Sequence, residues 1–152
     1  SRHARAHRVY GNLLFRAGRL AQAEKVLMRS IWLDSTDATV LLDLGHLLAR
    51  SGRHSQARLR FQQAYTASTC KQDAAAADVA MSALYMTLGR AEDAHAFFER
   101  ASSRDATLAN EDTLLALVAD FRTNLPTTQP AHTPDSQHTA HAEPHTSDTQ
   151  ST

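Results

Sequence analysis

The sequence of 152 residues contains one cysteine, Cys70, so no disulfide can form within the chain. A lone thiol does not require an oxidising compartment. No apolar run approaches the roughly 18 residues of a membrane-spanning helix, and no signal-peptide pattern is visible at the start. We therefore expect a cytoplasmic protein without a membrane segment. The chain begins at Ser1 rather than Met, as a fragment or a processed protein would.

Neither sign of charge is in excess, since 16 basic residues balance 16 acidic ones. Only Lys25 and Lys71 are lysines and the other basic residues are arginines, which we attribute to a GC-rich bacterial genome. The basic residues are spread over both faces of the expected helices among acidic neighbours such as Glu24, without an aromatic platform for bases. We therefore expect no nucleic-acid partner.

Proline is absent from the first 125 residues. All four prolines lie in residues 126–152, a segment rich in Thr, Ser, His and Gln with almost no aliphatic residue. Such a segment cannot bury enough apolar surface to offset the entropy lost on ordering. We expect residues 1–125 to form the folded domain and residues 126–152 to be a disordered tail. Its histidines are read as part of a solvated spacer: His132, His138, His141 and His145.

One short pattern occurs three times. Residues 17–27 read AGRLAQAEKVL, residues 51–61 read SGRHSQARLRF, and residues 88–98 read LGRAEDAHAFF. The first two copies are 34 residues apart and the last two 37. The three extra residues fall around Lys71–Ala74, which we place between helices because insertion there costs little.

Glycine is scarce, and all five glycines lie within the repeating region. Gly18, Gly52 and Gly89 each separate two apolar patterns of helical spacing, which predicts a turn with positive φ between two helices. Gly11 and Gly45 fall inside expected helices, where glycine costs about 1 kcal/mol relative to Ala. We expect each of these two to permit close packing of a partner helix.

Apolar residues recur throughout at helical spacing, and no alternation of strand type is visible. The sequence therefore predicts an all-α protein. Asp37 and Asn110 are expected N-caps, and Glu111 and Asp112 suit the positive end of the last helix. The expected helices cover residues 4–17, 20–33, 38–51, 54–68, 74–87, 91–103 and 110–124.

Two helices in 34 residues, with large and small residues in a fixed order, resemble the tetratricopeptide repeat family. The resemblance covers residues 4–106, without the family's proline at the end of the second helix. Asp78 stands where the family packs an aromatic residue, so we expect the third repeat to begin loosely. The matching positions are His7, Tyr10, Gly11, Leu14, Ala23 and Leu27 in the first repeat, Leu41, Leu44, Gly45, Leu48, Ala57 and Phe61 in the second, and Asp78, Met81, Ser82, Tyr85, Ala94 and Phe98 in the third.

The resemblance implies an α-α superhelix, a solenoid of three helix pairs followed by a capping helix. The repeats would cover about 4–37, 38–71 and 75–108, and the capping helix about 110–124. In the family, the first helices of successive repeats line a groove that binds a peptide or a helix of a partner protein. The implied groove residues are Arg8, Asn12, Phe15, Arg16, Leu42, His46, Ala49, Arg50, Val79, Ala83, Met86 and Thr87.

This lining changes from basic to apolar along the groove, which would suit a protein or peptide with acidic groups near one end and an aliphatic anchor near the other. We therefore expect a non-catalytic adaptor. The alternative is a cytosolic chaperone of a type III secretion translocator or a related secretion component, a class similar in size and repeat number. The sequence does not indicate the oligomeric state.

Catalytic and metal-binding patterns are weak. The chain has no Gly-x-Ser-x-Gly, phosphate-binding glycine loop or His-Glu-x-x-His motif, so we expect no enzymatic activity and no cofactor. No sequence feature assigns a base to Cys70, which we read as an inert thiol. His3 and His7 are one helical turn apart, but a metal site needs further ligands, and we expect no metal there.

Overall fold

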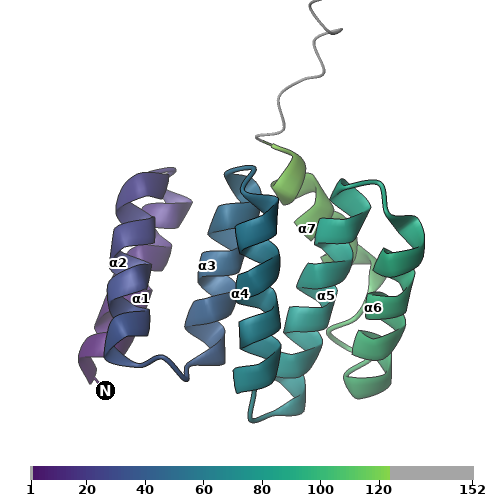
Figure 1. The fold of residues 1–152 in the computed structure, drawn as a ribbon, viewed down its shortest axis with the longest axis horizontal. Coiled ribbons are helices and arrows are strands. Elements are labelled where there is room, and N and C mark those ends of the chain that lie inside the picture. Colours follow the sequence, from purple (N-terminus) through teal and green to yellow (C-terminus); the bar gives the residue numbers. More distant parts are fainter. Residues whose placement is uncertain (1, 124–152) are drawn as a thin grey trace, which may run out of the picture.

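The structure is a computed structural model that describes residues 2–123. All regular secondary structure in this part of the chain is α-helical and it contains no strand, which confirms the predicted all-α class (Figure 1). The predicted tail, residues 126–152, lies outside the described residues. The helices are α1 (Arg2–Arg16), α2 (Leu20–Leu33), α3 (Ala38–Arg50), α4 (His54–Ala67), α5 (Lys71–Thr87), α6 (Ala91–Arg104) and α7 (Glu111–Arg122). Among these helices, none has the length and apolar character needed to cross a membrane.

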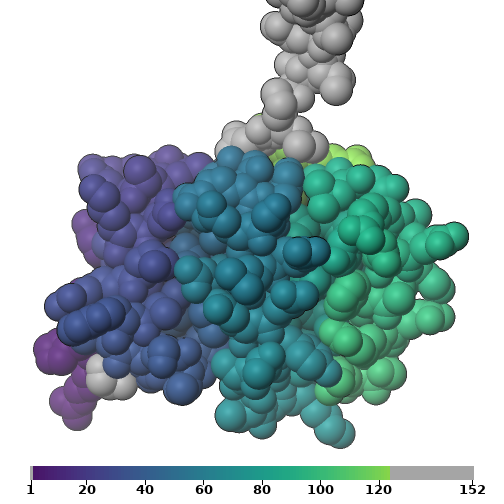
Figure 2. Space-filling view, in the orientation of Figure 1, coloured from purple at the N-terminus to yellow at the C-terminus, as the bar shows by residue number. Residues whose placement is uncertain are grey.

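The first six helices form three consecutive pairs, α1 with α2, α3 with α4, and α5 with α6, which lie side by side (Figures 1 and 2). Each pair is closed by a glycine with positive φ: 76° at Gly18, 79° at Gly52 and 75° at Gly89. In the first turn the amide of Arg19 donates to the carbonyl of Leu14 at 2.9 Å. The same bond closes the other two turns at the same length. The predicted glycine turns are therefore confirmed.

Gly11 and Gly45 are points of close contact between paired helices. A Cβ atom on Gly11 would lie 2.8 Å from Cγ of Leu27, and one on Gly45 would lie 2.6 Å from Cδ1 of Phe61. Both distances are too short for carbon atoms in contact, so any side chain here would displace the partner residue. The predicted close packing at these two glycines is confirmed.

The predicted caps are also present. The amide of Thr39 donates to Oδ1 of Asp37 at 3.0 Å, and the amide of Thr113 donates to Oδ1 of Asn110 at 2.8 Å. Each bond satisfies an amide that has no partner within its own helix.

Two predictions about the third pair are wrong. The extra residues do not lengthen a loop but extend α5, which begins at Lys71 after Cys70, whose Sγ accepts from the amide of Asp73 at 3.4 Å. The pair also does not begin loosely, because Asp78 is fully buried and has partners. Arg100 donates to its carboxylate from Nε at 2.9 Å and from Nη2, and Arg104 lies 3.8 Å away. Two arginines of α6 thus pair with the buried charge of Asp78.

The first helices of the pairs lie closer to one another than the second helices do. The backbone of α3 approaches those of α1 and α5 closely, whereas the backbones of α2, α4 and α6 do not approach one another in this way within residues 2–123. The second helices meet through side chains, as Arg104 of α6 and Tyr65 of α4 do. The free side of α1, α3 and α5 is called the inner face below. Helix α7 passes behind α5 in Figure 1 and packs on α5 and α3. It therefore covers part of the inner face, rather than only capping the last pair as predicted.

Candidate functional site

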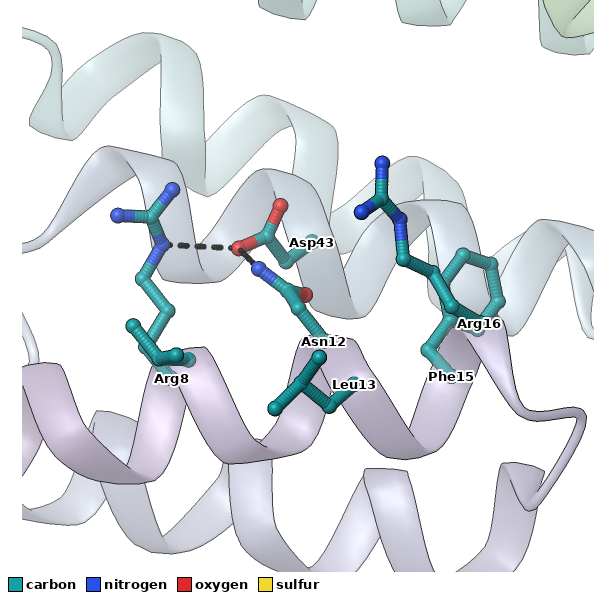
Figure 3. A pocket seen from close by; sticks show the side chains of 7 residues that line it. Arg8, Asn12, Leu13, Phe15, Arg16 and Asp43 are labelled. Atoms are coloured by element: carbon teal, nitrogen blue, oxygen red, sulfur yellow. Dashed lines mark hydrogen bonds and ion pairs between the residues drawn. The ribbon is translucent and has the colours of Figure 1, made fainter.

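The part of the inner face next to α7 remains open between α1 and α3. A hollow of about 420 Å³ lies there, and we call it the α1–α3 hollow (Figure 3). Its residues come from successive turns of α1 and from one position of α3. They are Arg8, Val9, Asn12, Leu13, Phe15, Arg16 and Asp43.

Asp43 is the only carboxylate that lines the α1–α3 hollow, and α1 holds it from two positions. Nε of Arg8 and Nδ2 of Asn12 each donate to Oδ2 of Asp43 at 2.9 Å (Figure 3). Arg8 and Asn12 are four residues apart and therefore reach the same point from one face of the helix. These bonds hold α1 against α3. The charge of Asp43, the one carboxylate of the hollow, is paired with that of Arg8.

Arg16 lies at the other end of the α1–α3 hollow and is exposed. It forms no ion pair with any carboxylate of the described residues. Phe15 beside it is half-buried, and the guanidinium of Arg50 lies 5.2 Å from the centre of its ring. The hollow therefore combines an unpaired cation with an aromatic surface, a combination that suits an anionic group next to an apolar one.

Helix α7 fills the neighbouring part of the inner face with apolar side chains. Phe121 is fully buried, and its ring centre lies 5.8 Å from His46 and 6.2 Å from Phe61. Val118 is buried as well. Nε of Arg50 lies 3.9 Å from Oδ1 of Asp120 in α7, so Arg50 links the covered and the open parts of the inner face.

His46 is a residue of the inner face whose pKa is shifted by its surroundings. Its ring packs against both Phe61 and Phe121, and its Nε2 is buried without a hydrogen-bond partner among the described residues. Burial lowers the pKa of His46, and the negative charges of Asp43 and Asp120 oppose this shift. The neutral imidazole is therefore the form that the contact with α7 accommodates.

The structure brings the predicted groove residues of the first repeat together but separates those of the later repeats. Arg8, Asn12, Phe15 and Arg16 all line the α1–α3 hollow. His46 and Arg50 contact α7, and Met86 and Thr87 are half-buried, with the hydroxyl of Thr87 donating to the carbonyl of Ala83 at 2.8 Å.

For four of the predicted groove residues, the assignment to an open groove is wrong. They are all at least 94% buried, because α7 and the neighbouring helices pack over α3 and α5. Leu117 of α7, for example, packs against the cluster that contains Val79. The four residues are Leu42, Ala49, Val79 and Ala83.

The structure also shows the surroundings of Cys70, His3 and His7, the remaining candidate residues from the sequence. Cys70 is exposed and caps α5. His7 is within hydrogen-bond distance of the backbone of His3, with 2.7 Å between Nδ1 and the carbonyl oxygen. No group of three or more His, Cys, Asp or Glu side chains in residues 2–123 is placed to hold a metal ion.

Sequence reasoning did not identify Asp43 and Asp120 as partners of the inner-face arginines. A signal for α7 was present, because Leu114, Leu117, Val118 and Phe121 recur at helical spacing and require a surface to cover them.

No protein-family model matches this chain, and no curated protein matches it significantly.

Proposed function

We propose that this protein is a non-catalytic binding module of the tetratricopeptide type, which takes an acidic segment of a partner polypeptide in the α1–α3 hollow. The observation that carries the proposal is the exposed Arg16 beside Phe15. Arg16 has no ion-pair partner within residues 2–123, and the one carboxylate of the hollow already has two donors. An incoming carboxylate would gain a charge-assisted hydrogen bond from Arg16 without displacing an existing partner.

The repeat geometry supports assignment to the tetratricopeptide type. Three glycine turns share the same φ within a few degrees and the same closing hydrogen bond. A small residue of the first helix meets a large one of the second in two pairs, Gly11 with Leu27 and Gly45 with Phe61. In a layer built this way, the closely spaced first helices lie on the inner side of the curve, where the family binds its partners.

The partner would also need an apolar component. Val9 and Leu13 are 52% and 58% exposed at the edge of the α1–α3 hollow, and Phe15 is half-buried within it. Helix α7 offers a guide to the shape of such a partner, because it already covers the adjacent part of the inner face with one apolar side. A segment with acidic and aliphatic residues on one side, continuing the line of α7 toward α1, fits this surface best.

Selection from a displayed library of short peptides tests the proposal. We expect the wild-type protein to enrich peptides that carry Asp or Glu next to Leu, Ile or Val. Arg16→Glu should weaken their binding about tenfold or more, since a hydrogen bond to a charged group contributes about 1.5–3 kcal/mol. The matched control is Arg19→Glu, at an exposed arginine outside the hollow, which should keep the affinity. Equal loss in both variants, or peptides without acidic residues, would overturn the proposal.

Arg50 is less suitable for this test, although the sequence places it in the same groove. Because Arg50 also pairs with Asp120, Arg50→Glu would put two carboxylates together and disturb α7. The narrower alternative, a chaperone of a secretion translocator, differs from a general adaptor in predicting one dominant secreted client, and no feature of the hollow favours it.

A further inference from the structure

Helix α1 has a second exposed surface, which adjoins the α1–α3 hollow and shares Val9 and Leu13 with it. Tyr10 is 56% exposed, and together with Val9 and Leu13 it forms an apolar strip on the solvent side of the helix. A shallow hollow with a volume of about 440 Å³ follows this strip. We call this surface the α1 end face. Its residues are Arg2, Arg5, Ala6, Val9, Tyr10 and Leu13.

The later repeats show what covers the residues equivalent to Tyr10. Tyr10 corresponds to Leu44 in α3 and to Met81 in α5, and these residues are 1% and 2% exposed. They are buried because each of α3 and α5 packs against the helix pair that precedes it. Within residues 2–123 no helix pair precedes α1. The α1 end face therefore carries apolar side chains of the kind that the later repeats bury, but no helix of the described residues covers it.

The charge of the α1 end face restricts what can cover it. Helix α1 contains four arginines and no acidic residue. Residues 2–70 carry 11 basic and 4 acidic residues, a net charge of +7, whereas residues 71–123 carry 5 basic and 9 acidic ones, a net charge of −4. The described part of the chain is thus positive toward the α1 end and negative toward α7.

The negative part has an exposed surface of complementary character on α7. Leu115 is 53% exposed, and the exposed acidic residues Glu111 and Asp112 lie one turn before it on the same side of the helix. We call these three residues the α7 outer face. It is acidic and apolar, whereas the α1 end face is basic and apolar.

We propose that the α7 outer face of one copy of this protein docks on the α1 end face of a second copy. Opposite charges would steer the two faces together, and the apolar strips would be buried between them. Two α1 end faces do not fit each other, because arginines would then face arginines. The contact joins two different surfaces, so it leaves one of each free and can add further copies in the same direction.

Sedimentation velocity at low ionic strength tests this contact. We expect the mean mass to rise above the 16.7 kDa of a single chain as the protein concentration increases, and to fall toward that value as salt is added. Tyr10→Glu should leave a single chain at every concentration. The matched control is Trp32→Glu, at an aromatic residue of α2 that is 73% exposed, and it should associate like the wild type. Circular dichroism establishes that both variants remain helical.

Mixing two variants shows which faces meet. Tyr10→Glu removes the α1 end face and Leu115→Lys alters the α7 outer face, so neither should associate alone. An equimolar mixture should form a complex of two chains and nothing larger, since each variant keeps one working face. A wild-type mass that does not depend on concentration would overturn the proposal. Association of Leu115→Lys alone would overturn it too, because it would indicate a contact that does not use α7.

The α1 end face and the α1–α3 hollow share Val9 and Leu13, so the test uses a residue that lines the α1 end face alone. Tyr10 does not line that hollow, so Tyr10→Glu should still bind the peptides selected by the wild-type protein. Loss of association with retained peptide binding identifies the α1 end face specifically. Loss of both would indicate that the substitution disturbed α1 itself. In that case Arg5→Glu, at an exposed residue of the same face, provides the test. Continued association of Arg5→Glu would overturn the proposal.

Discussion

Arg50 of α3 and Asp120 of α7 face each other across the inner face, with 3.9 Å between Nε and Oδ1. Both side chains are about one-third exposed, so the pair contributes little to stability. The position of this ion pair shows where the contact of α7 with the inner face ends. It marks the line along which α7 ends its cover of the inner face and the α1–α3 hollow begins.

Phe121 should be the residue that holds α7 in place. It is fully buried against His46 and Phe61, so Phe121→Ala should lower the free energy of unfolding by about 3–5 kcal/mol through lost burial and a cavity. Arg122→Ala, at an exposed position of the same helix, should change it by at most about 0.5 kcal/mol. Urea unfolding monitored by circular dichroism measures both, and equal effects would contradict the assigned orientation of α7.

The half-buried His46, whose Nε2 is buried, should make stability depend on pH. Its pKa in the folded protein is lowered by burial from the ordinary value of 6.5, so the unfolded chain binds the proton more readily. The stability associated with neutral His46 is therefore complete above about pH 6.5. It decreases as the pH falls below that value, by at most about 1.4 kcal/mol per pH unit.

Urea unfolding at several pH values measures this effect. His46→Leu should remove this part of the pH dependence, because Leu fills a similar space without a titrating group. His95→Gln, at an exposed histidine of α6, should retain it. The charged groups that act on the ring are Asp43 of α3 and Asp120 of α7, and the same slope in wild type and His46→Leu would show that the ring is not the source.

The ion pair of Asp78 and Arg100 should be asymmetric when it is broken. The side chain of Asp78 is 1% exposed and that of Arg100 is 44% exposed, and the hydrogen bond to Asp78 raises the pKa of Arg100. Arg100→Met leaves a buried carboxylate with only Arg104, 3.8 Å away, and should cost about 3 kcal/mol. The double variant Asp78→Leu with Arg100→Met should regain much of this loss.

Denaturant titrations of the three proteins test this prediction. The matched control is Arg90→Met, since Arg90 pairs with Asp93 at 2.7 Å on the surface, and its effect should stay below about 1 kcal/mol. A double variant no more stable than Arg100→Met would show that the buried carboxylate is not the cause of the loss.

Gly45→Ala should reverse the usual effect of replacing a helical glycine. Alanine normally stabilises a helix by about 1 kcal/mol relative to glycine, but a Cβ here would lie 2.6 Å from Cδ1 of Phe61. The ring must move, and we expect a net loss of about 1–3 kcal/mol. Gly45→Ala combined with Phe61→Leu should show a smaller added cost than the sum of the two single changes, as a thermal-unfolding cycle would reveal. An increase in stability for Gly45→Ala alone would contradict the packing.

Local features of this fold could be predicted from the sequence because their causes are local. Gly18 has positive φ because a chain leaving one helix for the next needs it, and Asp37 caps a helix because its carboxylate reaches an amide two residues on. The close packing at Gly11 and Gly45 could also be predicted, since a helix tolerates glycine only where packing compensates for it.

The place of α7 could not be predicted in the same way. The spacing of Leu114, Val118 and Phe121 shows which side of the helix is buried, but it does not say against which surface. For the same reason the sequence places Leu42 and Val79 in an open groove, since its apolar pattern does not distinguish a residue covered by α7 from one covered by a partner. The partners of Asp78 were also hidden, because Arg100 is 22 residues away and meets it only after α6 folds back on α5.

The three glycine turns have one further consequence. Each ends a first helix and opens a second with the same backbone geometry, so the chain segment from one turn to the next begins and ends on interchangeable junctions. A gene duplication that copied residues 18–51 would therefore rejoin through a turn the protein already possesses. Lengthening by one unit would require no new loop, and later substitutions could adapt only the surfaces where the added pair met its neighbours.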